Sequence, residues 1–278
     1  MIVFTTFTST GYEAARDRII KEVSANGRFD KVYTYNESEL TPELLASPTF
    51  HIKKGLGHYS WKPDVIWQTL NKVDEGDIVV YLDAGCTVYD SKEWDLYFSY
   101  LEKYDILAFR LHQYNYKWTR KSVFDHFSSE ITTNWRESFQ YGANALMLKK
   151  NEASLTFVRE WREYMIERLD LCGDVSKEER PYEDFRLIEN RYDQTIMTAL
   201  LYKYMSKGNV KSIWEHFEGN DPFRSQAFKA SRKRNNKDHD VTRSFMSTIK
   251  CVVKQYIYYP IVGNYILLKT ARDNKIKW

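Results

Sequence analysis

The run Ile78–Leu82 constrains the fold more than any other stretch of this sequence. It is apolar, rich in β-branched and aromatic residues and too short for an independent helix, which predicts a buried central strand. The run ends in Asp83-Ala84-Gly85. Open α/β sheets bind ligands beyond the carboxyl ends of their strands, so Asp83 is a candidate ligand-binding residue. Gly85 permits a sharp turn and the close approach of a bulky polyanion. The alternative is an ordinary Asp-containing turn.

Short apolar runs alternate with amphipathic stretches along the chain. The predicted strands cover residues 2–4, 31–35, 78–82, 106–111, 144–148 and 210–214. The predicted helices cover residues 12–24, 94–103, 152–171 and 193–205, with one more beginning near Pro63. This alternation is typical of an α/β fold in which helices cover a largely parallel sheet.

Composition and charge divide the chain into two parts. A length of 278 residues with 43% hydrophobic and 28% charged residues is typical of a soluble globular protein with one large core. Residues 224–278 carry 13 Lys+Arg against 3 Asp+Glu, a net charge of +10, which leaves 28 against 35, or −7, for residues 1–223. We therefore expect an acidic body, residues 1–221, and a basic tail, residues 222–278, that meets an anionic surface.

The tail carries an amphipathic pattern. Apolar residues recur at helical spacing, with Lys250 and Lys254 between them; these residues are Phe245, Ile249, Val252, Tyr256 and Tyr259. A basic amphipathic helix near aromatic residues predicts an interfacial anchor on anionic lipid, and the alternative is a helix docked on the body. No stretch has the roughly 18 uncharged apolar residues that a spanning helix needs.

The cysteines and the first residues favour a cytosolic location. The three cysteines, Cys86, Cys172 and Cys251, are odd in number, far apart and without metal-ligand spacing, which is typical of a reducing compartment. The sequence begins with a predicted strand and lacks the basic start and apolar run of a secretory signal.

Four motifs in order carry a family resemblance. They are WKP at 61–63, YLDAGC at 81–86, QYGANALMLKKNE at 140–152 and RYDQTIMTALLYKY at 191–204. Together they resemble the bacterial GT-A-fold glycosyltransferases encoded with capsule and O-antigen assembly genes, over roughly residues 1–217. The resemblance implies a GT-A-like, Rossmann-like, mixed and mostly parallel sheet with helices on both faces, followed by a helical tail. It also implies a hexosyltransferase that uses a nucleotide-diphosphate sugar, most often a UDP-sugar.

The resemblance implies a divalent metal, and the sequence departs from the pattern that binds one. Such enzymes hold Mn²⁺ or Mg²⁺ with an Asp-x-Asp after the central strand; Asp83 matches the first position, and Gly85 replaces the second carboxylate. These ions can bind through few protein ligands together with phosphate oxygens and waters, so a metal remains an expectation. His216 resembles the late histidine that completes the metal site, although a histidine beside Trp214 and Phe217 is more often structural.

The donor site is expected around the start of the helix near Pro63. Lys62 lies near a helix N-terminus, whose dipole favours a phosphate, although a solvated lysine is the simpler reading. The resemblance places the nucleotide near the first strand and the diphosphate near Asp83. The residues so implied are Thr5, Thr6, Phe7, Tyr59, Trp61, Lys62, Asp83, Ala84 and Gly85.

Asp193 is the second candidate catalytic carboxylate beside Asp83. It begins a predicted helix, where an Asp is a good N-cap, and that is its structural alternative. In the resemblance it deprotonates the acceptor hydroxyl or contacts donor sugar hydroxyls. Glu183-Asp184 is a less favoured acid pair. The residues expected to line the sugar pocket are Gln140, Tyr141, Gly142, Asn144 and Gln194.

We therefore expect a glycosyltransferase that acts on a lipid-linked oligosaccharide acceptor in surface polysaccharide synthesis, peripheral to the cytoplasmic face of the membrane. One alternative is a nucleic-acid-binding protein acting through the basic run 229–240, which the acidic body disfavours. Another is a catalytically inactive, transferase-like binding module, which the missing second carboxylate favours.

Overall fold

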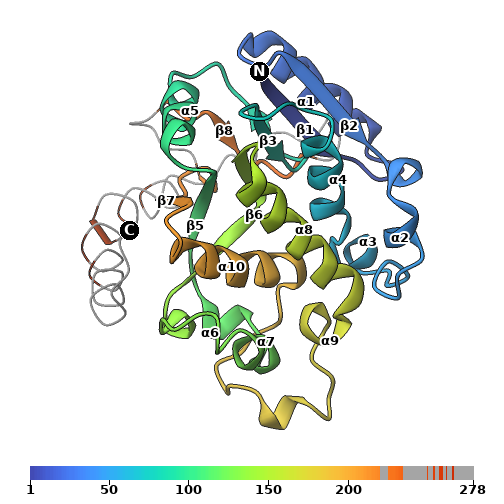
Figure 1. Ribbon diagram of the computed structural model, residues 1–278, viewed down its shortest axis with the longest axis vertical. Helices are drawn as coiled ribbons and strands as arrows, with labels where there is room; N and C mark the ends of the chain where they lie inside the picture. The colour runs from blue at the N-terminus through green and yellow to red at the C-terminus, as the bar shows by residue number, and fades with distance from the viewer. Residues whose placement is uncertain are drawn as a thin grey trace.

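The structure is a computed structural model that describes residues 1–219, residues 225–233 and the single positions 249, 253, 257, 258, 261 and 265 (Figure 1). Most of the predicted tail, 222–278, therefore lies outside the described residues, including four positions of its predicted apolar face (245, 252, 256 and 259). The division of the chain at residue 221 stays a prediction.

One six-stranded sheet organises the body. Its strand order is β2-β1-β3-β6-β5-β7. The strands are β1 (Ile2–Phe7), β2 (Lys31–Tyr35), β3 (Ile78–Leu82), β5 (Ile106–Tyr114), β6 (Phe139–Lys149) and β7 (Val210–Trp214). β6 is antiparallel to both neighbours, and the other pairs are parallel. The expected mixed and mostly parallel sheet is confirmed. Two short strands, β4 (Thr87–Val88) and β8 (Phe228–Lys229), pair antiparallel beside it.

Helices cover both faces of this sheet (Figure 1). The longer helices are α1 (Glu13–Asn26), α4 (Trp61–Leu70), α5 (Glu93–Lys103), α8 (Glu152–Glu167) and α10 (Tyr192–Met205). The shorter ones are α2 (Pro42–Leu45), α3 (Gly55–His58), α6 (Asn115–Trp118), α7 (Lys121–His126), α9 (Leu169–Cys172) and the 3₁₀ turns Glu37–Glu39, Trp135–Glu137 and Arg180–Tyr182. Buried side chains of α1 and α5 form one core cluster, and those of α4, α8 and α10 form the other.

Alternation along β3 decides on which face the candidate site lies. Val79 and Tyr81 belong to the core under α4, α8 and α10, whereas Val80 and Leu82 belong to the core under α1 and α5. Side chains alternate between the faces of a strand, so Asp83 follows Tyr81 to the α4–α10 side. The hydrogen bond from the Tyr81 hydroxyl to Asp83 Oδ1, at 2.6 Å, agrees with this placement.

Several predicted boundaries were wrong. β1 continues to Phe7, because the hydroxyls of Thr5 and Thr6 find partners inside the protein and their polarity does not end the strand. β6 begins at Phe139 rather than at residue 144. The helix expected over 152–171 breaks at Arg168, whose backbone is not helical (φ −117°, ψ 61°). Across the described part of the chain, no helix combines the length and apolar character that crossing a membrane requires.

Candidate active site

Three charged side chains from distant parts of the sequence meet at the carboxyl end of β3. Lys62 Nζ lies 3.4 Å from Asp83 Oδ1 and 3.2 Å from Asp193 Oδ2. Lys62 comes from the first turn of α4, Asp193 from the first turn of α10, and Asp83 from the loop after β3. The two helix N-termini therefore point at the end of the central strand, where their dipoles favour negative charge.

Asp83 is the accessible member of this group. Its side chain is 33% exposed, whereas the side chains of Lys62 and Asp193 are 7% and 5% exposed. Tyr81 donates to its Oδ1, and Lys62 Nζ lies 3.5 Å from its Oδ2. Asp83 thus stands at the mouth of the group and does not point into packed interior.

Asp193 is a buried carboxylate that is only partly satisfied. Burial and the negative charge of Asp83 raise its pKa to about 6, and the ammonium of Lys62 opposes this increase. Its Oδ2 is in ion-pair range of Lys62 yet has no hydrogen bond of ordinary geometry among the described residues. A buried oxygen in this state can accept a hydroxyl proton from a ligand. The predicted N-cap role is wrong, because α10 begins at Tyr192 with Arg191 as the N-cap.

Lys62 stays charged in this surrounding. Burial alone would lower its pKa, but the charges of Asp193 and Asp83 raise the pKa above the ordinary value for lysine. Its ammonium also lies 5.1 Å from the ring centroid of Tyr59 and 5.6 Å from that of Trp61, within the range of cation–π attraction. The simple reading of a solvated lysine at a helix start is therefore wrong.

A left-handed turn precedes α4 and positions Tyr59 and Lys62. Residues 55–59 all have φ between 49° and 75°. Glycine is required at position 57, because a Cβ there would lie 2.7 Å from the Cα of Phe50. The non-glycine residues of the turn, such as Tyr59, each carry about 1–2 kcal/mol of backbone strain. Such strain persists where the surrounding structure holds it and is frequent at functional sites.

Tyr192 and His58 hold the two helix starts together, and sequence reasoning missed both. Tyr192, with φ 46°, immediately precedes Asp193; its ring stacks on that of His58 with centroids 4.2 Å apart. Its hydroxyl donates to Asp174 Oδ1 at 2.6 Å. Burial lowers the pKa of His58, which favours the neutral, stacked ring. The sequence signal that could have indicated them is the Gly55-x-Gly57 pair, because glycine is the residue that most readily adopts positive φ.

The residues present do not fit the expected metal site. His216 Nε2 lies 2.6 Å from Glu93 Oε1, so its ring pairs with α5. Asp83 contacts a lysine ammonium, and position 85 supplies no carboxylate. Within residues 1–219 and 225–233, no three His, Cys, Asp or Glu side chains are grouped to hold an ion. The cation that lies between the two carboxylates is the ammonium of Lys62.

The predicted nucleotide residues on β1 are mostly occupied within the protein. Thr5 Oγ1 pairs with Thr69 Oγ1 at 2.9 Å, and Thr6 Oγ1 donates to the Leu82 carbonyl at 2.8 Å. Phe7 stacks on Trp61 with centroids 4.2 Å apart. The hydroxyls of Thr5 and Thr6 therefore bond within the protein. Among the aromatic residues predicted to bind the nucleotide, Tyr59 is the accessible one, with 38% of its surface exposed.

The predicted sugar-pocket residues lie on or beside β6 and differ in their surroundings. Gln194 Nε2 donates to Gln140 Oε1 at 2.9 Å, which joins α10 to β6 next to Asp193. The carbonyl of Asn144 accepts from the Asp83 amide, and a Cβ on Gly142 would lie 2.7 Å from Asn144 Oδ1.

Three other predicted residues have partners of their own. Tyr141 is fully buried, and its hydroxyl pairs with Ser212 Oγ at 2.8 Å, so its ring fills the core. The carbonyl of Ala84 accepts from Arg18. In the Glu183-Asp184 pair, Asp184 is held by Arg136 and Arg186, which lower its pKa.

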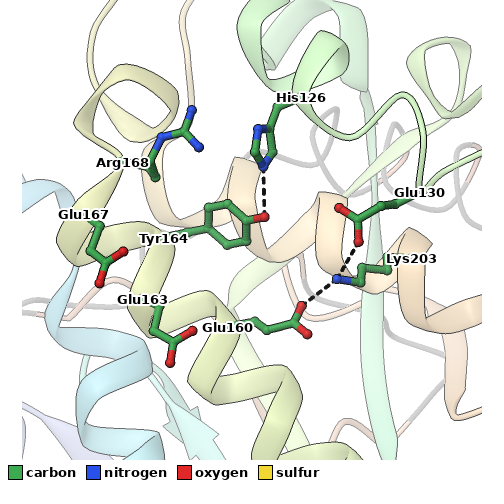
Figure 2. A pocket seen from close by; sticks show the side chains of 8 residues that line it. All are labelled: His126, Glu130, Glu160, Glu163, Tyr164, Glu167, Arg168 and Lys203. Atoms are coloured by element: carbon green, nitrogen blue, oxygen red, sulfur yellow. Dashed lines mark hydrogen bonds and ion pairs between the residues drawn. The ribbon is translucent and has the colours of Figure 1, made fainter.

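A cavity of about 320 Å³ lies away from this site, between α7, α8 and α10 (Figure 2). In it, Lys203 Nζ lies 2.7 Å from Glu130 Oε2 and 2.9 Å from Glu160 Oε2. His126 and Tyr164 pair across its other end at 2.9 Å. None of its lining residues belongs to the predicted site.

Comparisons with known proteins return similar structures only. No protein-family model and no curated protein matches the chain. It is similar to the structure of the galactosyltransferase LgtC in complex with donor and acceptor sugar analogues (14% identity, 78% of this chain and 74% of that one, TM-score 0.40). It is also similar to a glycosyltransferase involved in glycosylation of the major capsid of PBCV-1 (11%, 77% and 82%, 0.41) and to mouse xyloside xylosyltransferase 1 (8%, 77% and 85%, 0.42). These similarities are too weak to assign an activity to this chain.

Proposed function

We propose that the protein is a glycosyltransferase that takes a sugar from a nucleotide-diphosphate donor. The observation that carries this proposal is the meeting of Lys62, Asp83 and Asp193 at the carboxyl end of β3, beneath two helix N-termini. A sugar-nucleotide transferase has to neutralise a leaving diphosphate and receive the proton of an acceptor hydroxyl. This group contains a buried cation, an accessible carboxylate and a buried carboxylate of raised pKa.

Asp193 is the proton acceptor in this proposal. The acceptor oxygen bonds to the anomeric carbon, the bond from that carbon to the diphosphate breaks with its electron pair leaving on phosphate, and the hydroxyl proton moves to Asp193. A pKa of about 6 leaves the carboxylate mostly ionised at neutral pH and able to take a proton. Lys62 keeps this buried charge compensated. No step is assigned to Mn²⁺ or Mg²⁺, because the side chains at the site do not match the ligands that these ions need.

The finer assignments rest on the four motifs and the tail. We propose a UDP-hexose donor and a lipid-linked oligosaccharide acceptor in capsule or O-antigen synthesis, with the enzyme on the cytoplasmic face of the membrane. The described tail positions are consistent with an interfacial segment, because all six carry apolar or aromatic side chains that are 40–66% exposed, namely Ile249, Val253, Ile257, Tyr258, Ile261 and Tyr265. Basic residues near an anionic surface each add about 1 kcal/mol to such binding.

The donor assignment is tested with a panel of sugar nucleotides. We expect thermal stabilisation by one nucleotide-diphosphate sugar and slow release of its sugar to water, both measured with and without Mn²⁺. Asp83→Ala and Asp193→Ala should abolish turnover. Binding without turnover in the wild-type protein would instead indicate an inactive binding module, and no response to any nucleotide would contradict both readings.

The membrane assignment is tested separately. Wild-type protein should sediment with vesicles that contain an anionic phospholipid and stay in solution with neutral vesicles. Lys250→Glu/Lys254→Glu should lower that binding about 30-fold or more, because each change replaces attraction with repulsion. Equal vesicle binding of the variant and the wild type would contradict the membrane assignment.

A further inference from the structure

A short basic segment crosses the loop that follows Asp83. We call residues 228–233 the strap. Its first two residues form β8, which pairs with β4, and the Ser231 hydroxyl lies 2.8 Å from that of Thr87. Its last described residue, Lys233, donates its amide to the Gly85 carbonyl at 3.0 Å. The strap is thereby attached to the loop at Gly85 and to β4 at Thr87 and Val88.

The strap explains the glycine at position 85. A Cβ on Gly85 would lie 3.3 Å from the Cα of Arg232 and 3.7 Å from the amide nitrogen of Lys233. A contact of 3.3 Å with backbone leaves room for at most a small side chain. The backbone of Arg232 therefore occupies the space that a side chain at position 85 would need. A second carboxylate of the Asp-x-Asp kind would displace the strap.

The strap brings positive charge to the place where the second metal ligand is missing. Arg232 has a left-handed backbone (φ 54°), and its side chain is 74% exposed. It pairs with Glu218 at 2.8 Å. An exposed ion pair of this kind contributes little to stability, so a phosphate can replace Glu218 at little cost. Arginine binds phosphate through paired, charge-assisted hydrogen bonds, which are stronger.

We propose that the strap is a diphosphate-binding element, and that Arg232 and Lys233, together with Lys62 across the loop, supply the positive charge for which related sites use a divalent cation. This inference rests on the proposed function, and it deepens that function by assigning the leaving diphosphate to protein cations. Two consequences follow: donor binding persists without divalent metal, and removal of the strap charges weakens the diphosphate contact itself.

The test measures equilibrium binding of UDP and of inorganic pyrophosphate to the full-length protein, in EDTA and in Mn²⁺. We expect both affinities to change less than threefold between the two conditions. Arg232→Ala/Lys233→Ala should lose about tenfold or more in pyrophosphate affinity, the loss expected for at least one charge-assisted hydrogen bond. The matched control, Arg159→Ala/Lys207→Ala, removes the same charge from exposed positions on α8 and after α10 and should change affinity less than twofold.

The outcomes separate this inference from the proposed function. Binding that EDTA abolishes and Mn²⁺ restores would overturn the inference and leave the glycosyltransferase assignment standing. The same holds if the strap variant binds pyrophosphate as tightly as the control variant does. If no nucleotide diphosphate, no nucleotide-diphosphate sugar and no pyrophosphate binds under either condition, both proposals fail.

A second variant tests the strap contact without reference to activity. Gly85→Asp should push the strap away from the loop, because the new side chain meets backbone. Amide hydrogen exchange of Lys233 should then become faster, and UDP affinity in EDTA should fall. Unchanged protection of that amide would contradict the packing that the inference requires.

Discussion

Two lysines in this protein each lie between two carboxylates, and their surroundings differ. Lys203 contacts Glu130 and Glu160 at 2.7 and 2.9 Å on the wall of the α7–α8–α10 cavity (Figure 2). Lys62 contacts Asp193 and Asp83 at 3.2 and 3.4 Å at the end of β3. The side chains of Glu130 and Glu160 are 37% and 23% exposed, whereas that of Asp193 is 5% exposed.

This difference is the physical basis for distinguishing a structural ion group from the proposed catalytic one. The Lys203 group has short contacts, and Tyr204 also donates to Glu160 at 3.1 Å. The carboxylates of Glu130 and Glu160 are exposed enough for water to solvate the oxygens that the protein does not pair. In the Lys62 group, Lys62 and Asp193 are shielded from water whereas Asp83 is accessible, and the contacts are longer. Asp193 therefore keeps a raised pKa and an oxygen available for a ligand. In the proposed function, the same arrangement of three charges stabilises the surface in one place and takes part in catalysis in the other.

The largest expected effect is on sugar transfer. Asp193→Asn keeps the shape of the side chain but cannot take a proton, so the rate of transfer should fall about 10²- to 10⁴-fold. The matched change in the other group, Glu160→Gln, should alter the rate less than twofold. Both rates are measured at saturating donor. A normal rate for Asp193→Asn would remove Asp193 from the mechanism.

Removal of each lysine charge should affect stability unequally. Lys62→Met leaves the buried carboxylate of Asp193 without a compensating charge and should cost roughly 3–5 kcal/mol in the free energy of unfolding. Lys203→Met should cost about 1 kcal/mol, because water can solvate its partners. Urea unfolding with an unchanged m-value measures both. Equal costs would mean that burial does not distinguish the two groups.

The raised pKa of Asp193 predicts a pH effect of definite sign. The pKa is 3.8 for the unfolded reference and about 6 in the folded protein, so the folded state binds more protons between these values. The free energy of unfolding should therefore fall as pH rises from about 4 to 6, by up to roughly 3 kcal/mol from this group. Asp193→Asn should lose this contribution, so its stability relative to wild type should increase over that range. Parallel pH profiles for the two proteins would contradict the assignment.

The smallest expected effect concerns the exposed group. Glu130→Gln should lower the free energy of unfolding by less than about 1 kcal/mol, and the loss should shrink in 1 M salt because exposed charges are screened. The cost of Lys62→Met should change little with salt, because buried pairs are screened less. Urea unfolding at low and high NaCl measures both dependences. A salt-insensitive Glu130→Gln would show that the cavity is drier than its exposure indicates.

Sequence patterns predicted the strand that ends at Asp83, and the family resemblance placed Lys62, Asp83 and Asp193 in one expected site. Apolar runs with sharp polar ends are local signals, and the carboxyl ends of parallel strands meet at one edge of a sheet. The antiparallel direction of β6 had no local signal, because strand direction depends on which neighbour the strand meets. The predicted strands omit polar residues such as Thr5 and Gln140, because the buried partners of these side chains are remote in sequence.

The sequence by itself determined the alternation of strands and helices, the residue types of the site and the split of charge between body and tail. These features follow from composition and from the spacing of apolar residues, and neither depends on how the chain folds in three dimensions. Only the tertiary structure decided that Lys62 is buried between two carboxylates, that His216 pairs with Glu93, and that Arg232 closes the space beside Gly85. Contacts between residues that are remote in sequence determine how deeply a charged side chain is buried and how many of its hydrogen bonds are formed. Burial and hydrogen bonding in turn decide whether a charged residue stabilises a surface or takes part in chemistry.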